Sequence, residues 1–352
     1  MTSSVLADEV TDDVLERARA LCPSAVRRIV RAGSGGNSRL YRVDCADGSY
    51  ALKSYPSRAQ DQRDRLGVEF QALSFMHRHG VTDVPRVLAA DAEAGLGLYE
   101  WIDGKVVSDP GPADADAATD FLARLHALRH AAEAGTLPLA SEACLSGAEV
   151  VAQIDRRLTR LREVAVAGEG DAELASFLRD RFAPAFADLA ALAAEGYRRL
   201  GMSFDAPLEL VARSLCPSDF GFHNALRRAD GKTIFIDFEY FGWDDPVKLT
   251  ADLLFHPGTR VEGAIKRRLV AASRTIHRDD PAFFGRLELL YPLIGLRWCM
   301  ILLNEFLPER WAHRVHADGA RDWTQVKRRQ LERAQTLLDA VYNSRSRFPY
   351  GE

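Results

Sequence analysis

Alternating apolar and polar positions predict that the first part of the chain is rich in β-strands. Apolar side chains stand at every second position from Tyr41 to Cys45, which is the pattern of a half-buried strand. By the same period of two, Ala51, Lys53 and Tyr55 share one face of a second strand. We expect the strands at residues 29–30, 40–45, 49–55, 84–90 and 96–102.

A helix predicted at residues 61–79 carries a carboxylate on its apolar face. At 100° per residue, Glu69 falls inside the apolar stripe, close to Leu73 and Met76. An unpaired carboxylate is costly to bury, so Glu69 either pairs with a cation or reaches solvent at the edge of the stripe. Lys53, on the preceding strand, is the candidate cation. The spacing alone leaves both interpretations open.

The character of the chain changes near residue 103, after which helices dominate. A helical stripe begins at residue 113, and Ala- and Arg-rich helices are expected over roughly residues 147–200. The pattern therefore predicts an α+β protein of two lobes. A β-rich N-terminal lobe comprises residues 1–102, and a mainly α-helical C-terminal lobe comprises residues 103–352, with a hinge near residues 99–104.

Composition narrows the classes of partner. The 352 residues are 47% hydrophobic and 27% charged, which allows a substantial core, and the formal net charge of −4 gives no reason to expect nucleic acid or an anionic membrane. The most apolar run, residues 289–303, is short for a membrane span and contains Arg297, so we interpret it as a core helix. Five scattered cysteines without C-x-x-C spacing and an acidic N-terminus predict reduced thiols and a cytoplasmic location.

The segment from residue 218 to residue 246 carries the chemistry that the sequence predicts. Asp230-Gly231 favours a two-residue hairpin turn, and that register would place Asn224 directly opposite Asp237. Amide and carboxylate oxygens suit a hard cation such as Mg²⁺, which leaves coordination sites for phosphates. Asp219, five residues before Asn224, would then lie beside the metal and handle a proton. Each of these features alone occurs often by chance.

A Gly-rich stretch at residues 33–38 separates two predicted strands. The glycines would let the backbone approach a phosphate closely, with N–H groups as donors, and the candidates are Gly35, Gly36 and Asn37. A simple hairpin loop has the same composition.

The order of these segments resembles the protein-kinase-like fold, and in particular the aminoglycoside phosphotransferase and choline kinase superfamily. The resemblance covers roughly residues 29–256. Its motifs are the Gly-rich loop, Tyr50-Ala-Leu-Lys53, Glu69, Leu98-Tyr-Glu-Trp-Ile-Asp-Gly104, Leu122-Ala-Arg-Leu-His126, Asp219 to Asn224, Ile236-Asp-Phe-Glu239 and Gly242-Trp-Asp-Asp-Pro246.

The resemblance implies an ATP- and Mg²⁺-dependent kinase that phosphorylates a hydroxyl group of a small molecule. Lys53, fixed by Glu69, would hold the α and β phosphates under the Gly-rich loop, and Glu100 and Ile102 would border adenine. Asn224 and Asp237 would bind the metal. Asp219 would accept the proton of the acceptor hydroxyl or orient that hydroxyl.

Two features of the chain bear on the acceptor. Asp245-Pro246 is a good helix start only eight residues after Asp237, which leaves no room for a peptide-docking activation segment and favours a small molecule. A polar or cationic acceptor would meet candidate pocket residues, namely Glu239, Asp244, Trp298 and Glu305.

The sequence also departs from the superfamily. Pro217-Ser218 precede Asp219 where relatives have His-Gly or His-Asn, and we consider Asp252 as the group that steadies the loop instead. This departure keeps a catalytically silent nucleotide-binding module as an alternative. A metal-dependent hydrolase that uses Asp219, Asp237 and His223 is a third interpretation, and it predicts no Lys53–Glu69 pair.

Overall fold

The chain divides into two compact units. The computed structural model describes residues 12–33, 38–57, 61–167, 172–258, 260–308 and 322–351. The first unit combines Met1–Val106 with Asn224–Tyr240, and the second combines Val107–His223 with Phe241–Glu352. The predicted hairpin at residues 224–237 therefore belongs to the first unit, although the sequence analysis placed it in the helical lobe.

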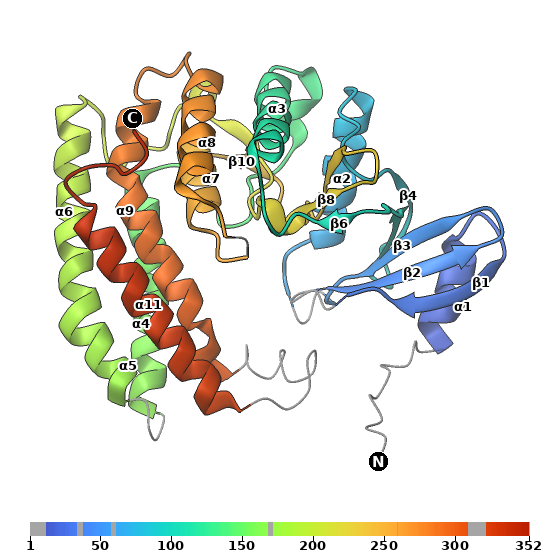
Figure 1. Ribbon diagram of the computed structural model, residues 1–352, viewed down its shortest axis with the longest axis horizontal. Coiled ribbons are helices and arrows are strands. Elements are labelled where there is room, and N and C mark those ends of the chain that lie inside the picture. Colours follow the sequence, from blue (N-terminus) through green and yellow to red (C-terminus); the bar gives the residue numbers. More distant parts are fainter. Residues whose placement is uncertain are drawn as a thin grey trace. The chain divides into compact units, whose positions relative to one another are not determined.

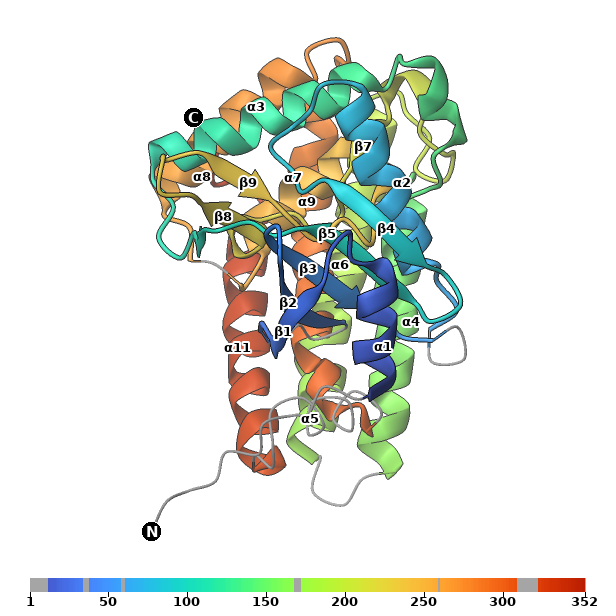
Figure 2. The same ribbon diagram turned by 90° about the vertical axis from the view of Figure 1, so that its right-hand side faces the viewer.

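The first unit is built on a five-stranded antiparallel sheet with strand order β1-β2-β3-β5-β4. Its strands are β1 (Val26–Arg31), β2 (Arg39–Cys45), β3 (Ser49–Ser54), β4 (Val87–Asp91) and β5 (Leu96–Glu100). The alternation that predicted β2 is confirmed, because Tyr41, Val43 and Cys45 are buried. Helix α1 (Asp12–Leu21) adds the buried Ala18 to this core and lies against the sheet in Figures 1 and 2.

Helix α2 (Arg65–Arg78) starts later than the predicted residue 61. Asp64 is its N-cap, and the Asp64 carboxylate accepts a hydrogen bond from the Gly67 N–H at 3.1 Å. Most of the predicted apolar stripe, including Leu73 and Met76, is buried, and Glu69 is buried with it.

The small sheet of the first unit corrects the predicted hairpin register. Strands β8 (Ala225–Arg227) and β9 (Thr233–Phe235) pair with Leu226 opposite Ile234, and β6 (Lys105–Val106) covers the other edge of β8. The turn is one residue longer than predicted, because the Arg228 N–H donates to the Lys232 C=O and Gly231 adopts φ +83°. A three-residue loop that ends in a left-handed glycine is the next most common hairpin connection. Asn224 therefore aligns with Ile236, and not with Asp237.

The second unit is mainly helical. Its α-helices are α3 (Pro112–Leu128), α4 (Gly147–Ala167), α5 (Ala172–Ser176), α6 (Ala183–Arg199), α7 (Pro246–Phe255), α8 (Gly263–Ile276), α9 (Phe283–Leu302) and α11 (Trp323–Asn343). Short helical turns are η1 (Ala132–Thr136), η2 (Phe177–Phe182), η3 (Leu210–Ala212), η4 (Phe222–Asn224) and η5 (Leu303–Phe306), and β7 (Ser214–Cys216) pairs with β10 (Gly242–Asp244). Helices α4, α6 and α11 pack around α9 (Figure 1).

Helix α9 is the core helix that the sequence predicted. The stretch Phe283–Phe306 is long and apolar enough to cross a membrane by length and composition alone, yet 72% of its apolar window is buried inside the protein. Burial of this extent is typical of the core of a folded domain. The predicted start of α7 is confirmed as well, since the Asp245 carboxylate caps it by accepting from the Val247 N–H at 2.8 Å.

Candidate active site

The predicted pair of Lys53 and Glu69 forms inside the first unit. Lys53 Nζ lies 2.6 Å from Glu69 Oε2, and the two residues are 8% and 4% exposed. Tyr55 directly follows β3, and its hydroxyl donates to the same Glu69 oxygen at 2.5 Å. Glu69 is thus buried and partnered, which settles the choice that helical spacing left open.

The segment after β9 brings two more carboxylates to Lys53. Lys53 Nζ lies 2.5 Å from Asp237 Oδ1 and 3.2 Å from Glu239 Oε2. Asp237 reaches this position with φ +70°, a left-handed conformation that aspartate tolerates better than most residues. The Phe238 N–H donates to Glu69 Oε1 at 3.1 Å and holds the segment against α2. Because Lys53 pairs with Glu69, the hydrolase interpretation loses its distinguishing prediction.

Burial and charge act in opposite directions on the two central groups. Burial alone would lower the pKa of Lys53, but the carboxylates of Asp237, Glu69 and Glu239 raise it well above its usual value. Burial raises the pKa of Glu69, and the Lys53 ammonium offsets this only in part. Lys53 is therefore a permanent cation within the range of physiological pH.

Arg65 is a site residue that the sequence analysis missed. It is 5% exposed, forms an ion pair with the buried Glu239 and donates to the Tyr240 hydroxyl at 2.6 Å. Its Nε also donates to Asp61 Oδ2 at 2.7 Å. The spacing held a signal for this contact, because Arg65 precedes Glu69 by four residues and so lies on the same buried face of α2.

The oxygen atoms around Lys53 suit a hard cation. Glu69, Asp237 and Glu239 each offer a carboxylate oxygen within 4.8 Å of the others. Glu239 Oε2 is buried and has no hydrogen bond among the residues that the structure describes. The side chain of Asp237 is 34% exposed, so it is open to solvent. An all-oxygen set of this kind fits Mg²⁺.

Asn224, the other predicted metal ligand, stands where the chain enters the first unit. Its carbonyl accepts from the Ile236 N–H at 2.9 Å, which places the backbones of the residues before β8 and after β9 side by side. The direct cross-strand pairing of Asn224 with Asp237 is wrong, because the longer turn shifts the register by one residue. Its role as a metal ligand stays a prediction.

In the second unit, Asp219 lies on a loop that β7 leads into. Ser218 adopts φ +70°, and its hydroxyl donates to the Ser141 carbonyl at 3.1 Å. Ser218, which departs from the superfamily pattern, thus provides one anchor for the loop. Asp252 binds Arg297 at 3.0 Å and the Trp298 indole N–H at 2.8 Å, so it can steady the loop only indirectly, through side chains packed against it.

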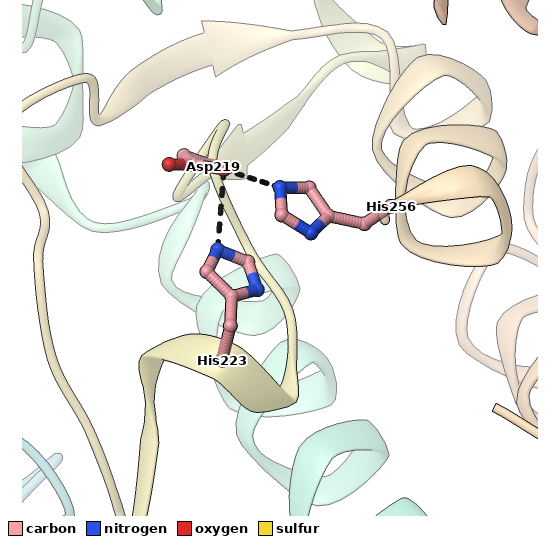
Figure 3. Close-up of side chains that lie close together, drawn as sticks. All are labelled: Asp219, His223 and His256. Atoms are coloured by element: carbon pink, nitrogen blue, oxygen red, sulfur yellow. Dashed lines mark ion pairs between the residues drawn. The ribbon is translucent and has the colours of Figure 1, made fainter. Parts of the chain in front are cut away.

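Two imidazoles converge on Asp219 (Figure 3). His256 Nε2 lies 3.2 Å and His223 Nε2 3.4 Å from Asp219 Oδ1. The two rings stack in parallel, with centroids 3.8 Å apart and an interplanar angle of 2°. Burial alone would raise the pKa of Asp219, but contacts with His223 and His256 lower it below the usual range. Sequence analysis missed His256, which directly follows α7 and carried no motif.

The four residues predicted to line an acceptor pocket are internal. Glu239 pairs with Arg65 and Asp244 pairs with Lys248 at 2.9 Å, while Trp298 and Glu305 are buried. A cavity of about 220 Å³ lies elsewhere in the second unit, between α4 and η5. It is lined by Glu142, Gln153, Arg156, Arg157, Arg160, Leu161, Asn304 and Leu307.

The remaining predicted nucleotide residues are only partly described. Gly35, Gly36 and Asn37 lie outside the described residues. Glu100 ends β5, opposite Tyr50 of β3, and Ile102 is buried two residues later. Their contacts with a nucleotide stay predictions.

Comparison with known proteins agrees with this geometry. The family model described as "Phosphotransferase enzyme family" matches residues 28–284. No curated protein matches the sequence.

Solved structures share the fold at low sequence identity. A choline kinase from Cryptosporidium parvum Iowa II is 11% identical, with a TM-score of 0.61 over 95% of this chain and 96% of its own. An aminoglycoside phosphotransferase from Alicyclobacillus acidocaldarius is 15% identical, with a TM-score of 0.57 over 93% and 95%. The aminoglycoside phosphotransferase of a streptomycin–ATP ternary complex is 14% identical, with a TM-score of 0.57 over 92% and 99%.

The fold comparison and the family match agree with the resemblance that the motifs carried. The family model spans most of the chain, including Lys53, Glu69, Asp219 and Asp237. The chain belongs to the phosphotransferase enzyme family, and it shares its fold with aminoglycoside phosphotransferases and choline kinases.

Proposed function

We propose that the protein is an ATP- and Mg²⁺-dependent kinase that transfers the γ-phosphoryl group to a hydroxyl of a small molecule. The observation that carries the proposal is the contact of Lys53 with both Glu69 and Asp237 inside one unit. A buried cation between a helix carboxylate and a partly exposed one is the arrangement that kinases use to hold nucleotide phosphates. An aminoglycoside phosphotransferase of the same fold binds ATP together with streptomycin.

Lys53 and Asp237 supply the nucleotide-binding chemistry in this scheme. Because its pKa is raised, Lys53 keeps its charge and can exchange the Asp237 carboxylate for phosphate oxygens while Glu69 holds it in place. Asp237, released from Lys53, and Asn224 would hold Mg²⁺, which neutralises charge on the phosphate oxygens.

Asp219 acts on the hydroxyl group of the acceptor in this scheme. Its lowered pKa keeps it ionised at neutral pH, so it can accept a hydrogen bond from the attacking hydroxyl and then its proton. General-base assistance of this kind contributes about 10²–10⁴ in rate. The larger part of the acceleration then comes from positioning and electrostatics.

The acceptor is expected to be small. Asp245 caps α7 eight residues after Asp237, so no long activation segment intervenes. The cavity between α4 and η5 begins at Glu142, next to the Ser141 carbonyl that anchors Ser218. Because three arginines line it, the acceptors tested should include anionic sugars and hydroxy acids beside amino alcohols and aminoglycosides.

Binding and transfer assays test the proposal. Calorimetric titration with ATP and Mg²⁺ should show binding that Lys53→Met abolishes, because the variant loses the cation for the phosphates. Transfer of ³²P from ATP to a panel of hydroxylated metabolites should reveal an acceptor. Asp219→Asn should lower kcat by about 10²–10⁴ and leave ATP binding intact.

ATP binding without phosphoryl transfer would favour a catalytically silent nucleotide-binding module. Tight ATP binding with no acceptor-dependent transfer, in the wild type and in Asp219→Asn alike, would replace the kinase with a nucleotide-binding regulatory protein. The serine before Asp219 is the observation that keeps this second function under test. Absence of ATP binding would contradict both.

A further inference from the structure

We propose that His256 is a positioning residue for the phosphoryl-transfer reaction: its Nε2–H holds one oxygen of Asp219 so that the other oxygen faces the acceptor hydroxyl. The inference rests on the proposed kinase function. It extends that function to a residue that lies outside every motif recognised in the sequence.

The tautomer of His256 follows from its backbone contact. The Gly258 N–H donates to His256 Nδ1 at 3.0 Å, so Nδ1 is the unprotonated nitrogen of the neutral ring. The proton is therefore on Nε2, which lies 3.2 Å from Asp219 Oδ1. A donor thus meets an ionised carboxylate oxygen, which is the favourable match.

The ring of His256 is held on two further sides. It stacks on His223 and meets the edge of Trp298 at a centroid distance of 4.9 Å and an angle of 83°. Trp298 is itself fixed, because its indole N–H donates to Asp252 at 2.8 Å. Side chains held in this way lose little freedom when they orient a partner.

Gly258 allows this packing because it has no side chain. A Cβ there would lie 2.9 Å from the His256 ring and 3.0 Å from His223 Cβ. The close backbone approach that supplies the N–H donor is therefore available only to glycine.

The side chains of Asp219, His223 and His256 do not form a good metal site in this arrangement. A metal ion lies near the plane of each imidazole that binds it, along the lone pair of the nitrogen. Two rings that are parallel and 3.8 Å apart direct their nitrogens along parallel lines, so one ion cannot lie in both planes. Hydrogen bonding from His256 alone to Asp219 is the role that this geometry fits, because His223 Nε2 has no hydrogen bond among the described residues.

The contact with His256 fixes the orientation of the Asp219 carboxylate. Figure 3 shows both imidazoles on one oxygen, Oδ1, while the second oxygen points away from both rings. Fixing Oδ1 removes rotation of the carboxylate and leaves Oδ2 to accept the hydroxyl proton. Loss of such alignment can cost about 10²-fold in rate.

Three substitutions at His256 separate positioning from packing. His256→Gln places an amide N–H near the position of Nε2, His256→Asn places one near Nδ1, and His256→Ala has neither. We expect Asn and Ala to lower kcat by roughly 10- to 100-fold with an unchanged KM for ATP, and Gln to restore kcat to within roughly threefold of the wild type. His130→Gln, on an exposed part of the second unit, is the matched control and should behave as the wild type.

Melting temperatures and a spectroscopic readout complete the test. If all three variants lose activity in proportion to lost stability, or if Gln and Asn are equivalent, His256 has only a packing role and the inference is wrong. Nitrogen-15 spectra of labelled histidine should show the Nε2–H tautomer of His256, and a Nδ1–H tautomer would contradict it. Because that readout needs no turnover, a wild type without kinase activity would refute the proposed function and leave the tautomer assignment to be judged separately.

Discussion

Lys53 shows how much of the site a local pattern can predict. Its pairing with Glu69 was accessible from the sequence, because a period of two on β3 and a period of 3.6 on α2 each place one of these residues on an inner face. The contact between Arg65 and Glu239 was not recognised, although the helical period places Arg65 beside Glu69. His256 had no local signal at all, since its contact with Asp219 depends on how α7 ends against a loop 37 residues earlier in the sequence.

The buried pair of Arg65 and Glu239 gives a prediction at this scale. Both side chains are at most 4% exposed, so removing Arg65 leaves the buried Glu239 carboxylate only partly compensated, by Lys53 at 3.2 Å. We expect Arg65→Met to destabilise the protein by about 3–5 kcal/mol, as measured by denaturant unfolding. The double variant Arg65→Met with Glu239→Leu should recover part of that loss, because no unpaired charge remains.

Arg63→Met is the matched control for Arg65→Met. Its partner is also Asp61, but its side chain is 39% exposed, and an exposed pair contributes about 0–1 kcal/mol. Equal effects of the two single substitutions would show that burial of the Arg65 pair does not govern its contribution.

At the scale of elements, strands and helices were predicted well, and the length of one hairpin turn was not. Alternation located β2 and the apolar stripe located α2, because both patterns record which face is buried. The hairpin register was wrong by one residue, since Asp230-Gly231 is compatible with either a two- or a three-residue loop. Side-chain chemistry at the turn does not determine its length.

Substitutions at Gly231 test the three-residue hairpin loop. With φ +83°, it occupies a left-handed position that costs an L-residue about 1–2 kcal/mol. We expect Gly231→Ala to lower the free energy of unfolding by about 1 kcal/mol and Gly231→Asn to lower it less, because asparagine tolerates this region. The exposed Gly48, which lacks a left-handed φ, is the control position, and equal costs of Gly→Ala at both would argue against the three-residue loop.

The contact between α3 and α8 predicts a pH dependence of stability. The rings of His126 in α3 and His277 form a T-shaped contact with centroids 4.4 Å apart. The Nδ1 of His126 lies 3.1 Å from Ser214 Oγ. Burial, together with the nearby Arg129, lowers the pKa of His126 from 6.5 to about 4. Burial also lowers the pKa of His277, to about 2.

Below pH 6.5 the unfolded chain therefore binds more protons than the folded protein, because unfolding restores the usual pKa of both histidines. The stabilisation from a neutral His126 is complete above that value and is lost as the pH falls towards 4, by up to about 3 kcal/mol. Denaturant unfolding at pH 7 and pH 5 should show the decrease, and His126→Gln should make it smaller. His130→Gln should make it only slightly smaller, because the charge of the exposed His130 is a minor cause of the lowered pKa of His126. A His126→Gln protein with the full pH dependence would assign the effect to other groups.

For the whole molecule, the main departure from the sequence-based picture is that the first unit is discontinuous. Its sheet and α2 come from residues 1–106, whereas Asp237 and Glu239 come from residues 224–240. Sequence order alone placed these two carboxylates in the other lobe, because nothing in a linear pattern shows that β8 pairs with β6.

A fragment comparison tests this organisation. Residues 1–106 alone lack β8, β9 and two of the three carboxylates around Lys53, so we expect no cooperative unfolding transition. The same fragment joined to residues 224–240 by a flexible linker should unfold cooperatively. In that fusion, Glu239→Gln should reproduce the destabilisation that it causes in the full chain. A fragment of residues 1–106 as stable as the fusion would contradict the division.

This interrupted layout constrains biosynthesis. A ribosome releases the strand that holds Lys53 and the helix that holds Arg65 long before it has made Asp237 and Glu239. Residues 107–223 emerge in between. The nascent N-terminal sheet must therefore wait, with two cations incompletely neutralised, until residue 240 is free. Premature termination anywhere in the inserted stretch leaves a polypeptide that has the lysine proposed to hold nucleotide phosphates and lacks the aspartate proposed to bind the metal.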